Sequence, residues 1–350
     1  MKNLNERVVM DFATQVVRWQ ETHGRHDLPW QNTRDPYRVW LSEIMLQQTQ
    51  VATVLNYFPL FLARLPSVES LAGAALDEVL GLWSGLGYYS RARNLHLCAQ
   101  AVMRLHGGRF PRTTLLLETL PGIGRSTAAA IASLCFGERV AILDGNVKRV
   151  LTRVLGFDSD LASTVNERRL WDEASRLLPL HDLTRAMPRY TQGLMDLGAT
   201  VCTTKKPKCT VCPLARSCVA QRLGQPEGYP VKTRKLKRSS QVIWLLWAQG
   251  QKDSVWLSQR PTPGVWAGLY CLPWFDQREA LAAAVPERYR TALQDTPSFI
   301  HVLTHKDLYL HPVQVQMPNS AMASAQGRWV ASDEWPRLGL PAPVRKLLQG

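Results

Sequence analysis

Residues 120–149 read LPGIGRSTAAAIASLCFGERVAILDGNVKR, and the order of elements within them is the most informative feature of the sequence. Residues 120–124 predict a tight turn, because Gly122 and Gly124 can adopt a positive φ and let another backbone approach closely. The Ala-rich run that follows predicts a helix whose first amide groups could hold a phosphate. Since residues 113–119 read as a helical turn, the pattern is a hairpin between two helices. An ordinary connecting turn would explain the two glycines equally well.

The sequence predicts a second helix after the Ala-rich one. Residues 140–143 are apolar and lead into Asp144, which directly precedes a predicted helix that begins near Gly145. An Asp at this position can cap the helix by accepting a hydrogen bond from its first turn. A carboxylate placed beside the hairpin could instead take part in chemistry, and these residues alone leave both roles open.

The composition favours a polyanionic partner. The chain has 350 residues, which is enough for two domains with separate cores. It carries 42 Lys and Arg against 28 Asp and Glu, a formal charge of +14 that is typical of proteins that bind nucleic acid. An inert basic surface is the alternative that charge alone leaves open. No apolar run is long enough to cross a membrane, and the pattern of a secretory signal is missing.

A change of pattern near residue 225 predicts two domains joined by a linker. Residues 1–225 show helical periodicity throughout. Residues 241–350 contain strand-like runs and two helical segments, so we expect an α+β domain there. Residues 226–240 form a linker with turn-forming Pro and Gly. Its basic side chains, either solvated or in contact with DNA, are Lys232, Arg234, Lys235, Lys237 and Arg238.

Four of the seven cysteines lie in one short loop, at residues 202–218. Cys202, Cys209, Cys212 and Cys218 are separated by six, two and five residues, so their thiolates can converge on one metal centre. An odd number of cysteines with this clustering indicates a reducing compartment rather than a disulfide framework. Zinc would accept four thiolates, although structural zinc usually has two pairs of closely spaced ligands, and free thiols are a third interpretation.

Glu43 is a candidate general acid. It lies between Ser42 and Ile44 in the segment WLSEIMLQQTQV at residues 40–51. A carboxyl group in an apolar pocket has a raised pKa, and this suits a group that must donate a proton. A surface Glu on an amphipathic helix is the other interpretation, and this segment alone does not exclude it.

Five motifs occur in an order that is typical of one family. They are WLSEIMLQQTQV at 40–51, LWSGLGYYSRARNLH at 82–96, LPGIGRSTA at 120–128, ILDGNVKRV at 142–150 and the four-cysteine loop. Together they resemble the helix-hairpin-helix DNA glycosylases and, in particular, the MutY-type adenine DNA glycosylases. The resemblance implies an all-α helix-hairpin-helix domain over residues 1–225 and a Nudix-like α+β domain over residues 241–350. It also implies a [4Fe-4S] cluster, because the cysteine spacing matches the cluster loop of this family.

The resemblance assigns roles to particular residues. In the family, the Glu of the first motif donates a proton to the leaving base, and this role falls on Glu43. The Asp of the LDGNV motif stabilises the transition state, which falls on Asp144, with Asn146 beside it. The residues implied to contact DNA are Gln48, Thr49, Leu86, Tyr88, Gly122, Gly124, Ser126 and Lys148. The implied cluster ligands are Cys202, Cys209, Cys212 and Cys218.

Position 126 separates two reaction types. Bifunctional enzymes of the endonuclease III class carry a Lys there that forms a Schiff base, whereas this chain has Ser126. Because a hydroxyl cannot form an imine, we expect a monofunctional glycosylase without that lyase step. Two alternatives stay open: an endonuclease III-like glycosylase and AP lyase, and a non-catalytic protein that binds damaged DNA.

The C-terminal domain carries the features expected to read the base opposite adenine. GVWAGLY at 264–270 resembles a Nudix fold, but the helix after Pro273 lacks the paired glutamates that hold metal in Nudix hydrolases. In the family, a Phe-Ser-His loop reads the damaged guanine, and it aligns with Leu303, Thr304 and His305. Thr304 keeps a hydroxyl and His305 is present, while Leu303 replaces the aromatic ring.

These implications combine into an adenine DNA glycosylase of base excision repair, a hydrolase that acts on adenine opposite 8-oxoguanine or guanine. We expect the enzyme to flip the adenine out of the duplex, because the base is inaccessible within the stack. The expected partner is double-stranded DNA, the protein is expected to be a monomer without membrane contact, and the expected setting is a bacterial cytoplasm.

Overall fold

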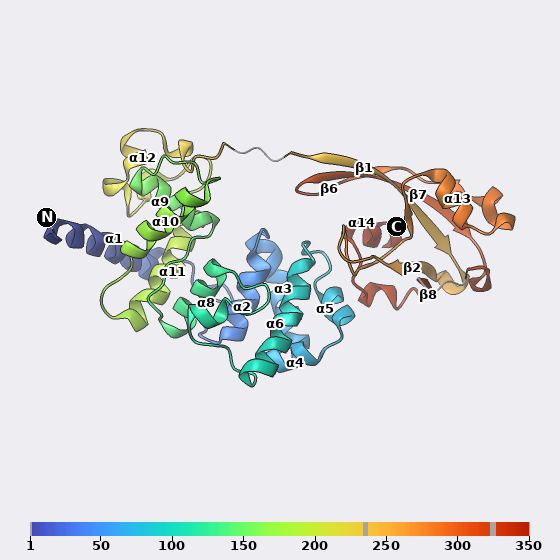
Figure 1. Ribbon diagram of the computed structural model, residues 1–350, viewed down its shortest axis with the longest axis horizontal. Helices are drawn as coiled ribbons and strands as arrows, with labels where there is room; N and C mark the ends of the chain where they lie inside the picture. Colours follow the sequence, from blue (N-terminus) through green and yellow to red (C-terminus); the bar gives the residue numbers. More distant parts are fainter. Residues whose placement is uncertain (1, 234–236, 323–326, 350) are drawn as a thin grey trace. The chain divides into compact units, whose positions relative to one another are not determined.

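The computed structural model describes residues 2–233, 237–322 and 327–349. The chain divides into two compact units. The first unit comprises Met1–Pro59, Ser67–Ala72 and Leu97–Lys235, and the second comprises Leu60–Pro66, Gly73–His96 and Leu236–Gly350. Helices build the first unit, whereas the second contains a sheet with helices packed on it (Figure 1). Three residues of the predicted basic linker lie outside the described residues, namely Arg234, Lys235 and Leu236.

The first unit is made of helices and short 3₁₀ turns. Its helices are α1 (Lys2–His23), α2 (Pro36–Leu46), α7 (Thr114–Leu117), α8 (Arg125–Phe136), α9 (Gly145–Leu155), α10 (Thr164–Arg176), α11 (Leu183–Thr200) and α12 (Val219–Arg222). Its 3₁₀ turns are η1 (Cys209–Val211), η2 (Ala215–Ser217) and η3 (Pro226–Gly228). Three further helices contain residues of both units: α3 (Val51–Arg64), α4 (Val68–Gly73) and α6 (Ser90–His106).

The core of the first unit lies along α11, which packs against α1, α8 and α9. Val16 of α1, Val150 of α9 and Leu197 of α11 are all fully buried in this core. Burying such side chains stabilises the fold by about 1.5–3 kcal/mol each. Three of the loop cysteines pack against the same cluster, so the cysteine loop is anchored to the helical core.

The predicted hairpin between two helices is present. α7 precedes a turn in which Gly122 has a φ of 75°, and α8 begins at Arg125 with Gly124 as its N-cap. The left-handed residue Gly137 ends α8. Residues 140–143 then lead to α9, whose N-cap is Asp144. The sequence therefore predicted both helix starts correctly.

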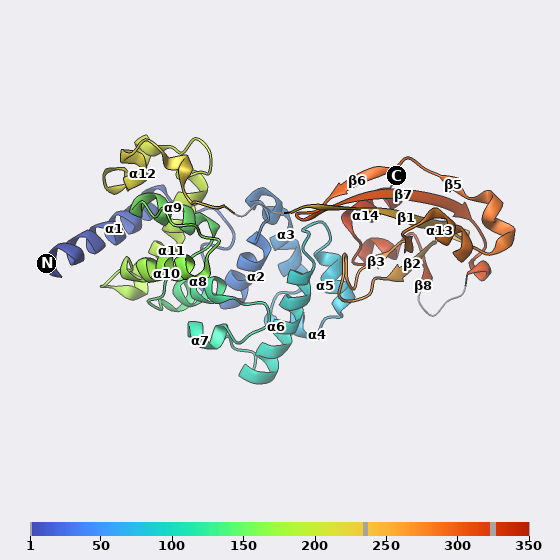
Figure 2. The same ribbon diagram turned by 45° about the horizontal axis from the view of Figure 1, so that its top comes forward.

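Among the described residues, the second unit contains an eight-stranded sheet. Its strands are β1 (Ser239–Gln249), β2 (Val255–Gln259), β3 (Tyr270–Cys271), β4 (Trp274–Phe275), β5 (Gln294–Asp295), β6 (Phe299–Val302), β7 (Lys306–Gln316) and β8 (Gly327–Val330). The main path through the sheet is β3-β2-β1-β7-β5, with β4 on β1, β6 on β7 and β8 on β2. The long strands β1 and β7 are parallel along their full lengths, and they lie side by side in Figures 1 and 2.

Helices cover both faces of this sheet. Side chains alternate along β1, so Ile243 joins the core on one face and Leu246 joins the core on the other. α14 (Ala342–Gln349) packs on the first face through Val344, and α13 (Arg278–Ala284) packs on the second through Leu281. The remaining elements of the second unit are α5 (Leu76–Leu82), η4 (Gln251–Asp253), η5 (Glu287–Ala292), η6 (Asn319–Ala321) and η7 (Trp335–Arg337).

Pro312 lies in the middle of β7, where its missing N–H would normally interrupt a ladder of hydrogen bonds. β6 pairs with β7 as far as Leu310, and β5 pairs with it from Val313 onward. Pro312 therefore falls in the gap between these two partners, and its carbonyl accepts a hydrogen bond from Thr296 N at 3.0 Å. Within the ranges described, no helix has both the length and the apolar character that a bilayer crossing requires.

Candidate active site and cysteine loop

A pocket of about 720 Å³ opens beside the start of α9 in the first unit. This volume lies within the range of about 300–1,000 Å³ that is usual for small-molecule sites. The predicted site residues that line it are Glu43, Gln48, Thr49, Ser126, Asp144 and Asn146. The fold therefore gathers two carboxylates and four of their predicted neighbours around one cavity.

Glu43 belongs to α2, a helix that packs on α8. Asp35 caps this helix by accepting a hydrogen bond from Tyr37 N at 3.0 Å. The residues on both sides of Glu43 in the chain are buried. Burial and then the nearby charge of Asp144 raise the pKa of the Glu43 carboxyl from 4.5 to about 7. A large fraction of Glu43 therefore carries a proton near neutral pH.

Asp144 is held by the N-terminus of α9. Its Oδ1 accepts a hydrogen bond from Val147 N at 2.7 Å. Burial raises the pKa of this carboxyl, while hydrogen bonds from Val147 and Asn146 and the charge of Arg149 oppose the rise. The positive end of the helix dipole acts in the same direction as these partners. Asp144 thus has groups that stabilise its charged form, whereas burial and the charge of Asp144 both favour the neutral form of Glu43.

Ser126 supports the backbone that leads into Asp144. Its Oγ accepts a hydrogen bond from Leu143 N at 3.1 Å, which joins the first turn of α8 to the residue before Asp144. The sequence indicated only that Ser126 cannot form a Schiff base. A bond to a backbone amide seventeen residues later leaves no pattern in the sequence, so this supporting role was missed.

Arg149 joins the pocket to the cysteine loop. Its guanidinium donates to Asn146 Oδ1 at 2.8 Å and to Gly198 O at 2.6 Å. The Nε of the same group donates to the backbone carbonyl of Cys202 at 2.7 Å. Sequence reasoning did not select Arg149, although its position three residues after Asn146 places the two side chains on one face of α9.

Two of the predicted DNA-contact residues have backbones in the left-handed region. Gln48 has a φ of 56° and Tyr88 a φ of 47°. Such a conformation costs a non-glycine residue about 1–3 kcal/mol and is concentrated at functional sites. Tyr88 is 43% exposed, whereas Leu86 is 5% exposed. Of these two residues of the second unit, only the tyrosine is open to solvent in the free protein.

The hairpin leaves its backbone accessible. Gly122 and Gly124 are exposed, and a Cβ placed on Gly124 would meet no other atom within 4 Å. Internal packing therefore does not require a glycine at position 124, and the open space leaves room for a ligand beside the backbone. Lys148, in contrast, forms an ion pair with Glu167 of α10. The structure thus gives Lys148 a protein partner.

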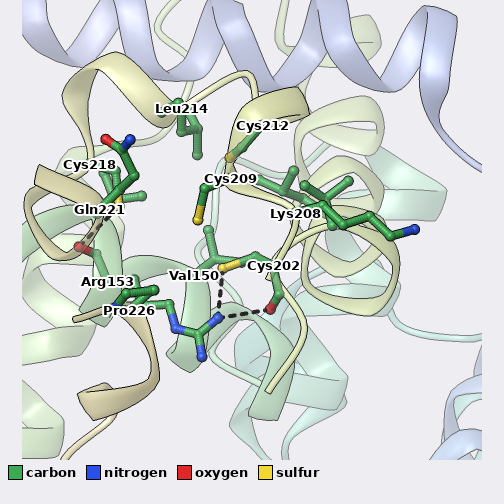
Figure 3. Close-up of a pocket in the computed structure, with 14 residues that line it drawn as sticks. Val150, Arg153, Cys202, Lys208, Cys209, Cys212, Leu214, Cys218, Gln221 and Pro226 are labelled. Carbon is green, nitrogen blue, oxygen red and sulfur yellow. Dashed lines mark hydrogen bonds between the residues drawn. The ribbon is translucent and has the colours of Figure 1, made fainter. Parts of the chain in front are cut away.

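The four loop cysteines line one small cavity of about 20 Å³. Figure 3 shows the sulfur atoms of Cys202 and Cys209 pointing into this space. Many of the other lining side chains are apolar, for example Val150 and Leu214. Burial and the three neighbouring thiols together raise the pKa of Cys212 to about 11, while a backbone hydrogen bond from Leu214 opposes the rise. Cys212 therefore becomes a thiolate readily only when a positive centre lies beside it.

Arg153 holds the cysteine loop from inside the protein. Its side chain is only 1% exposed. The guanidinium donates to Cys202 Sγ at 3.3 Å (Figure 3). It also donates to Thr203 O at 2.7 Å and to Thr204 O at 3.0 Å. A buried cation needs a nearby negative group, and thiolates around a metal centre would supply it.

The four cysteines match the ligand set of a cluster in number and type, but they are not arranged around a single ion in this structure. A zinc ion holds each sulfur at about 2.3 Å, so its four ligands must crowd around one point. In the part of the chain that the structure describes, no group of three or more Cys, His, Asp or Glu side chains is arranged to hold one metal ion. The four cysteines instead line a small cavity. An iron–sulfur cluster is larger than an ion and accepts four cysteine ligands, one on each iron.

In the second unit, the predicted lesion loop forms the turn between β6 and β7. Leu303 N donates to Lys306 O at 2.8 Å and closes the turn. The side chain of Leu303 packs against the sheet core, while Thr304 and His305 are exposed. The hydroxyl of Thr304 forms a hydrogen bond with the hydroxyl of Tyr88. The structure therefore brings together two predicted recognition residues that lie far apart in the sequence.

Comparison with known proteins gives the family. The model of the HhH-GPD superfamily of base excision DNA repair proteins matches residues 41–175, and a NUDIX domain model matches residues 243–350. An adenine DNA glycosylase of Buchnera aphidicola subsp. Acyrthosiphon pisum is 37% identical over 343 residues, which cover 97% of each chain. The chain belongs to the adenine DNA glycosylases. The human adenine DNA glycosylase is 43% identical over 228 residues, which cover 63% of this chain and 41% of the human protein.

A solved structure of another DNA glycosylase is similar to part of this chain. A thermostable thymine-DNA glycosylase matches with a TM-score of 0.54 and 30% identity, and covers 63% of this chain and 99% of its own. The fold class predicted from the sequence, a helix-hairpin-helix glycosylase domain with a Nudix-like α+β domain, is confirmed.

Proposed function

We propose that this adenine DNA glycosylase hydrolyses the N-glycosidic bond of adenine opposite 8-oxoguanine or guanine in double-stranded DNA. The observation that carries the proposal is the pair of carboxyl groups in one pocket, Glu43 and Asp144. Desolvation raises the pKa of both carboxyl groups, but at Asp144 hydrogen bonds from Val147 and Asn146 and the charge of Arg149 oppose the rise. Two acids with such different partners suit a reaction that needs one proton donor and one anion.

Glu43 donates its proton to N7 of the flipped adenine and so makes the base a better leaving group. As the bond to the sugar breaks, positive charge develops at C1′. Asp144, ionised and close by, stabilises this cation, and Asn146 helps to hold the carboxylate in place. A water molecule then adds to C1′, which leaves an abasic site and free adenine.

The protein reaches the base by extruding its nucleotide from the duplex. Gln48, Thr49, Leu86 and Tyr88 are proposed to contact or wedge the opened stack, and the left-handed backbones at Gln48 and Tyr88 support special roles for these two. The exposed amides near Gly122 and Gly124 are proposed to grip a phosphate. Lys148 can do so only by exchanging its partner Glu167 for the DNA backbone.

Ser126 makes the proposed enzyme monofunctional. A hydroxyl cannot form the imine that a lyase requires, so strand cleavage by that route is excluded. The hydrogen bond from Leu143 N gives Ser126 a supporting task in the same pocket. The alternative of an endonuclease III-like lyase therefore has no residue at this position to carry its chemistry.

The cysteine loop is proposed to hold a [4Fe-4S] cluster through Cys202, Cys209, Cys212 and Cys218. The cluster would fix the fold of the loop and would supply no step of the hydrolysis. Arg153 would complement its negative charge, and Arg149 would transmit the position of the loop to Asn146.

The domain organisation that we propose is a glycosylase domain at residues 1–225, a basic linker at 226–240 and a lesion-reading domain at 241–350. In the last of these, Thr304 and His305 would contact the base opposite adenine. We further propose a monomer that works on DNA in a bacterial cytoplasm, which agrees with the full-length similarity to a bacterial relative.

The test uses duplexes that carry A opposite 8-oxoguanine, A opposite G, or thymine glycol. The protein is incubated with each duplex, with and without hot alkali. Cleavage at A that depends on alkali supports a monofunctional adenine glycosylase. Cleavage at thymine glycol without alkali would select the lyase instead. The Glu43→Gln and Asp144→Asn variants should bind the duplex but release almost no adenine, and normal release by either would remove that residue from the mechanism.

A further inference from the structure

The turn that carries Tyr88 is tied to the C-terminal part of the second unit. We call residues 84–88 the wedge turn. Tyr89, directly after it, is 9% exposed, and its hydroxyl donates a hydrogen bond to the backbone carbonyl of Leu340 at 2.7 Å. Ser84, at the other end of the wedge turn, donates to the same carbonyl at 3.2 Å. One backbone oxygen thus holds both ends of the turn.

Two arginines strengthen this attachment. Arg345 of α14 donates from Nε to Ser84 Oγ at 2.9 Å. Beyond Tyr89, Arg93 of α6 donates to Ala267 O at 2.6 Å. Both contacts join residues that are more than 170 positions apart in the sequence. They therefore attach residues 84–93 to the C-terminal part of the second unit.

The wedge turn is also braced internally. Trp83 Nε1 donates to Gly87 O at 3.1 Å, and Arg91 donates to the carbonyl groups of Leu86 and Gly87 at 2.9 and 3.0 Å. Because the turn is held rigid, the positions of its two ends determine the position of the residue at its tip. That residue is Tyr88, whose hydroxyl contacts the lesion-loop residue Thr304.

We infer that Tyr89 is a positioning residue for recognition of the base opposite adenine, because its buried hydroxyl fixes the wedge turn so that Tyr88 and Thr304 meet that base as one surface. This inference rests on the proposed function. 8-Oxoguanine differs from guanine only by an oxygen at C8 and a hydrogen on N7. Two hydroxyl groups can distinguish such a small change only when supporting contacts hold them to within about 0.5 Å.

The Tyr89→Phe variant tests the inference, because it removes one hydroxyl and keeps the buried ring. Tyr309→Phe is the matched control, since Tyr309 lies on β7 and is 40% exposed. Single-turnover adenine release is measured for A:8-oxoguanine and A:G duplexes, at a temperature well below the Tm of each variant. We expect the ratio of the two rates to fall about fivefold or more in Tyr89→Phe, as for the loss of one hydrogen bond. The control should keep the wild-type ratio.

A second variant separates positioning from stability. If Tyr89 acts through Tyr88 and Thr304, then Tyr89→Phe should change the ratio little in a Thr304→Val background, because the contact is already lost. A lower Tm with an unchanged ratio would show that the hydroxyl only stabilises the fold, and would overturn the inference. Equal losses on both duplexes would also overturn it. Failure of the wild-type protein to release adenine from either duplex would instead refute the proposed function itself.

Discussion

Glu43 and Asp144 share one pocket, and burial raises the pKa of both carboxyl groups, but Asp144 has hydrogen bonds and a nearby positive charge that oppose the rise. Glu43 is surrounded by buried residues and faces the charge of Asp144, so its proton is retained to about pH 7. Asp144 accepts hydrogen bonds at a helix N-terminus and has Arg149 nearby. In the proposed mechanism, the different roles of these two similar side chains therefore come from the different groups around them.

The first prediction concerns the pH dependence of adenine release. Because Glu43 must carry its proton to act as an acid, kcat/KM should fall as pH rises above about 7, approaching tenfold for each pH unit. The measurement is kcat/KM on an A:8-oxoguanine duplex from pH 5.5 to 9. The affinity of Glu43→Gln for the same duplex over this range corrects for any loss of binding. A profile that stays flat to pH 9 would contradict the role of Glu43.

The second prediction concerns stability at the same residue. The folded protein binds the Glu43 proton more tightly than the unfolded chain, so stability from this group is complete below pH 4.5 and is lost as pH rises through about 7. A rise in pKa from 4.5 to about 7 corresponds to about 3 kcal/mol. Glu43→Gln should therefore be more stable than wild type at pH 8 and similar to it at pH 4.5, as measured by Tm. The exposed Glu118→Gln should show no such pH-dependent gain.

At the scale of elements, α9 connects the proposed chemistry to the cysteine loop. Its N-cap is Asp144, its first turn carries Asn146, and Arg149 and Arg153 follow one turn apart on the same side. Arg149 contacts both Asn146 and the backbone of Cys202, while Arg153 reaches the Cys202 sulfur. A displacement of the cysteine loop would therefore move α9 and, with it, the carboxylate of Asp144.

The third prediction tests the hold of α9 on the loop. Arg153→Met removes the buried guanidinium and leaves the carbonyl groups of Thr203 and Thr204 without their donor. We expect the broad absorbance near ~400 nm of a [4Fe-4S] protein, per mole of purified chain, to fall by about half or more. Arg222→Met changes an exposed arginine on α12 and should keep the wild-type absorbance. Full absorbance in Arg153→Met would show that the loop holds its cluster without this residue.

How far the sequence predicts an element depends on the range of its contacts. The starts of α8 and α9 follow from Gly124 and Asp144, because caps and glycine turns act over a few residues. The left-handed backbone at Gln48 leaves no such local sign, because the surrounding fold imposes it. Pro312 alone would argue against a strand at its position. The sheet accepts it only because β7 changes partner there, from β6 to β5.

At the scale of the whole molecule, each of the two units contains segments that lie far apart in the sequence, although the composition suggests one simple boundary. The composition changes near residue 225, but residues 73–96 group with the C-terminal sheet. Buried hydrogen bonds such as that from Tyr89 to Leu340 join segments 251 residues apart. The sequence of either segment alone does not predict this contact. Three of the five motifs, at 40–51, 120–128 and 142–150, nevertheless contribute residues to one pocket. Glu43 and Ser126 lie on helices and Asp144 lies at a helix start, which are features that local sequence determines.

The last prediction follows from the charge of +14 on the whole chain. If the protein neutralises DNA phosphates, the logarithm of its affinity should fall linearly with the logarithm of the salt concentration, with a slope of about −0.9 for each phosphate contacted. The measurement is the Kd of Glu43→Gln for an A:8-oxoguanine duplex between 50 and 200 mM salt, since this variant should not release the base. We expect affinity to fall at least about tenfold over that range, and a Kd independent of salt would contradict the predicted contacts with the phosphate backbone.

The same experiment decides the role of Lys148. In the free protein this lysine is paired with Glu167, so a contact with phosphate requires exchange of one anion for another. If the exchange occurs, Lys148→Gln should weaken binding similarly for all duplexes and reduce the salt slope by about 1. Lys346→Gln removes an exposed charge from α14 and should leave the slope unchanged. An unchanged slope in Lys148→Gln would mean that Lys148 keeps its protein partner on DNA and contributes no phosphate contact.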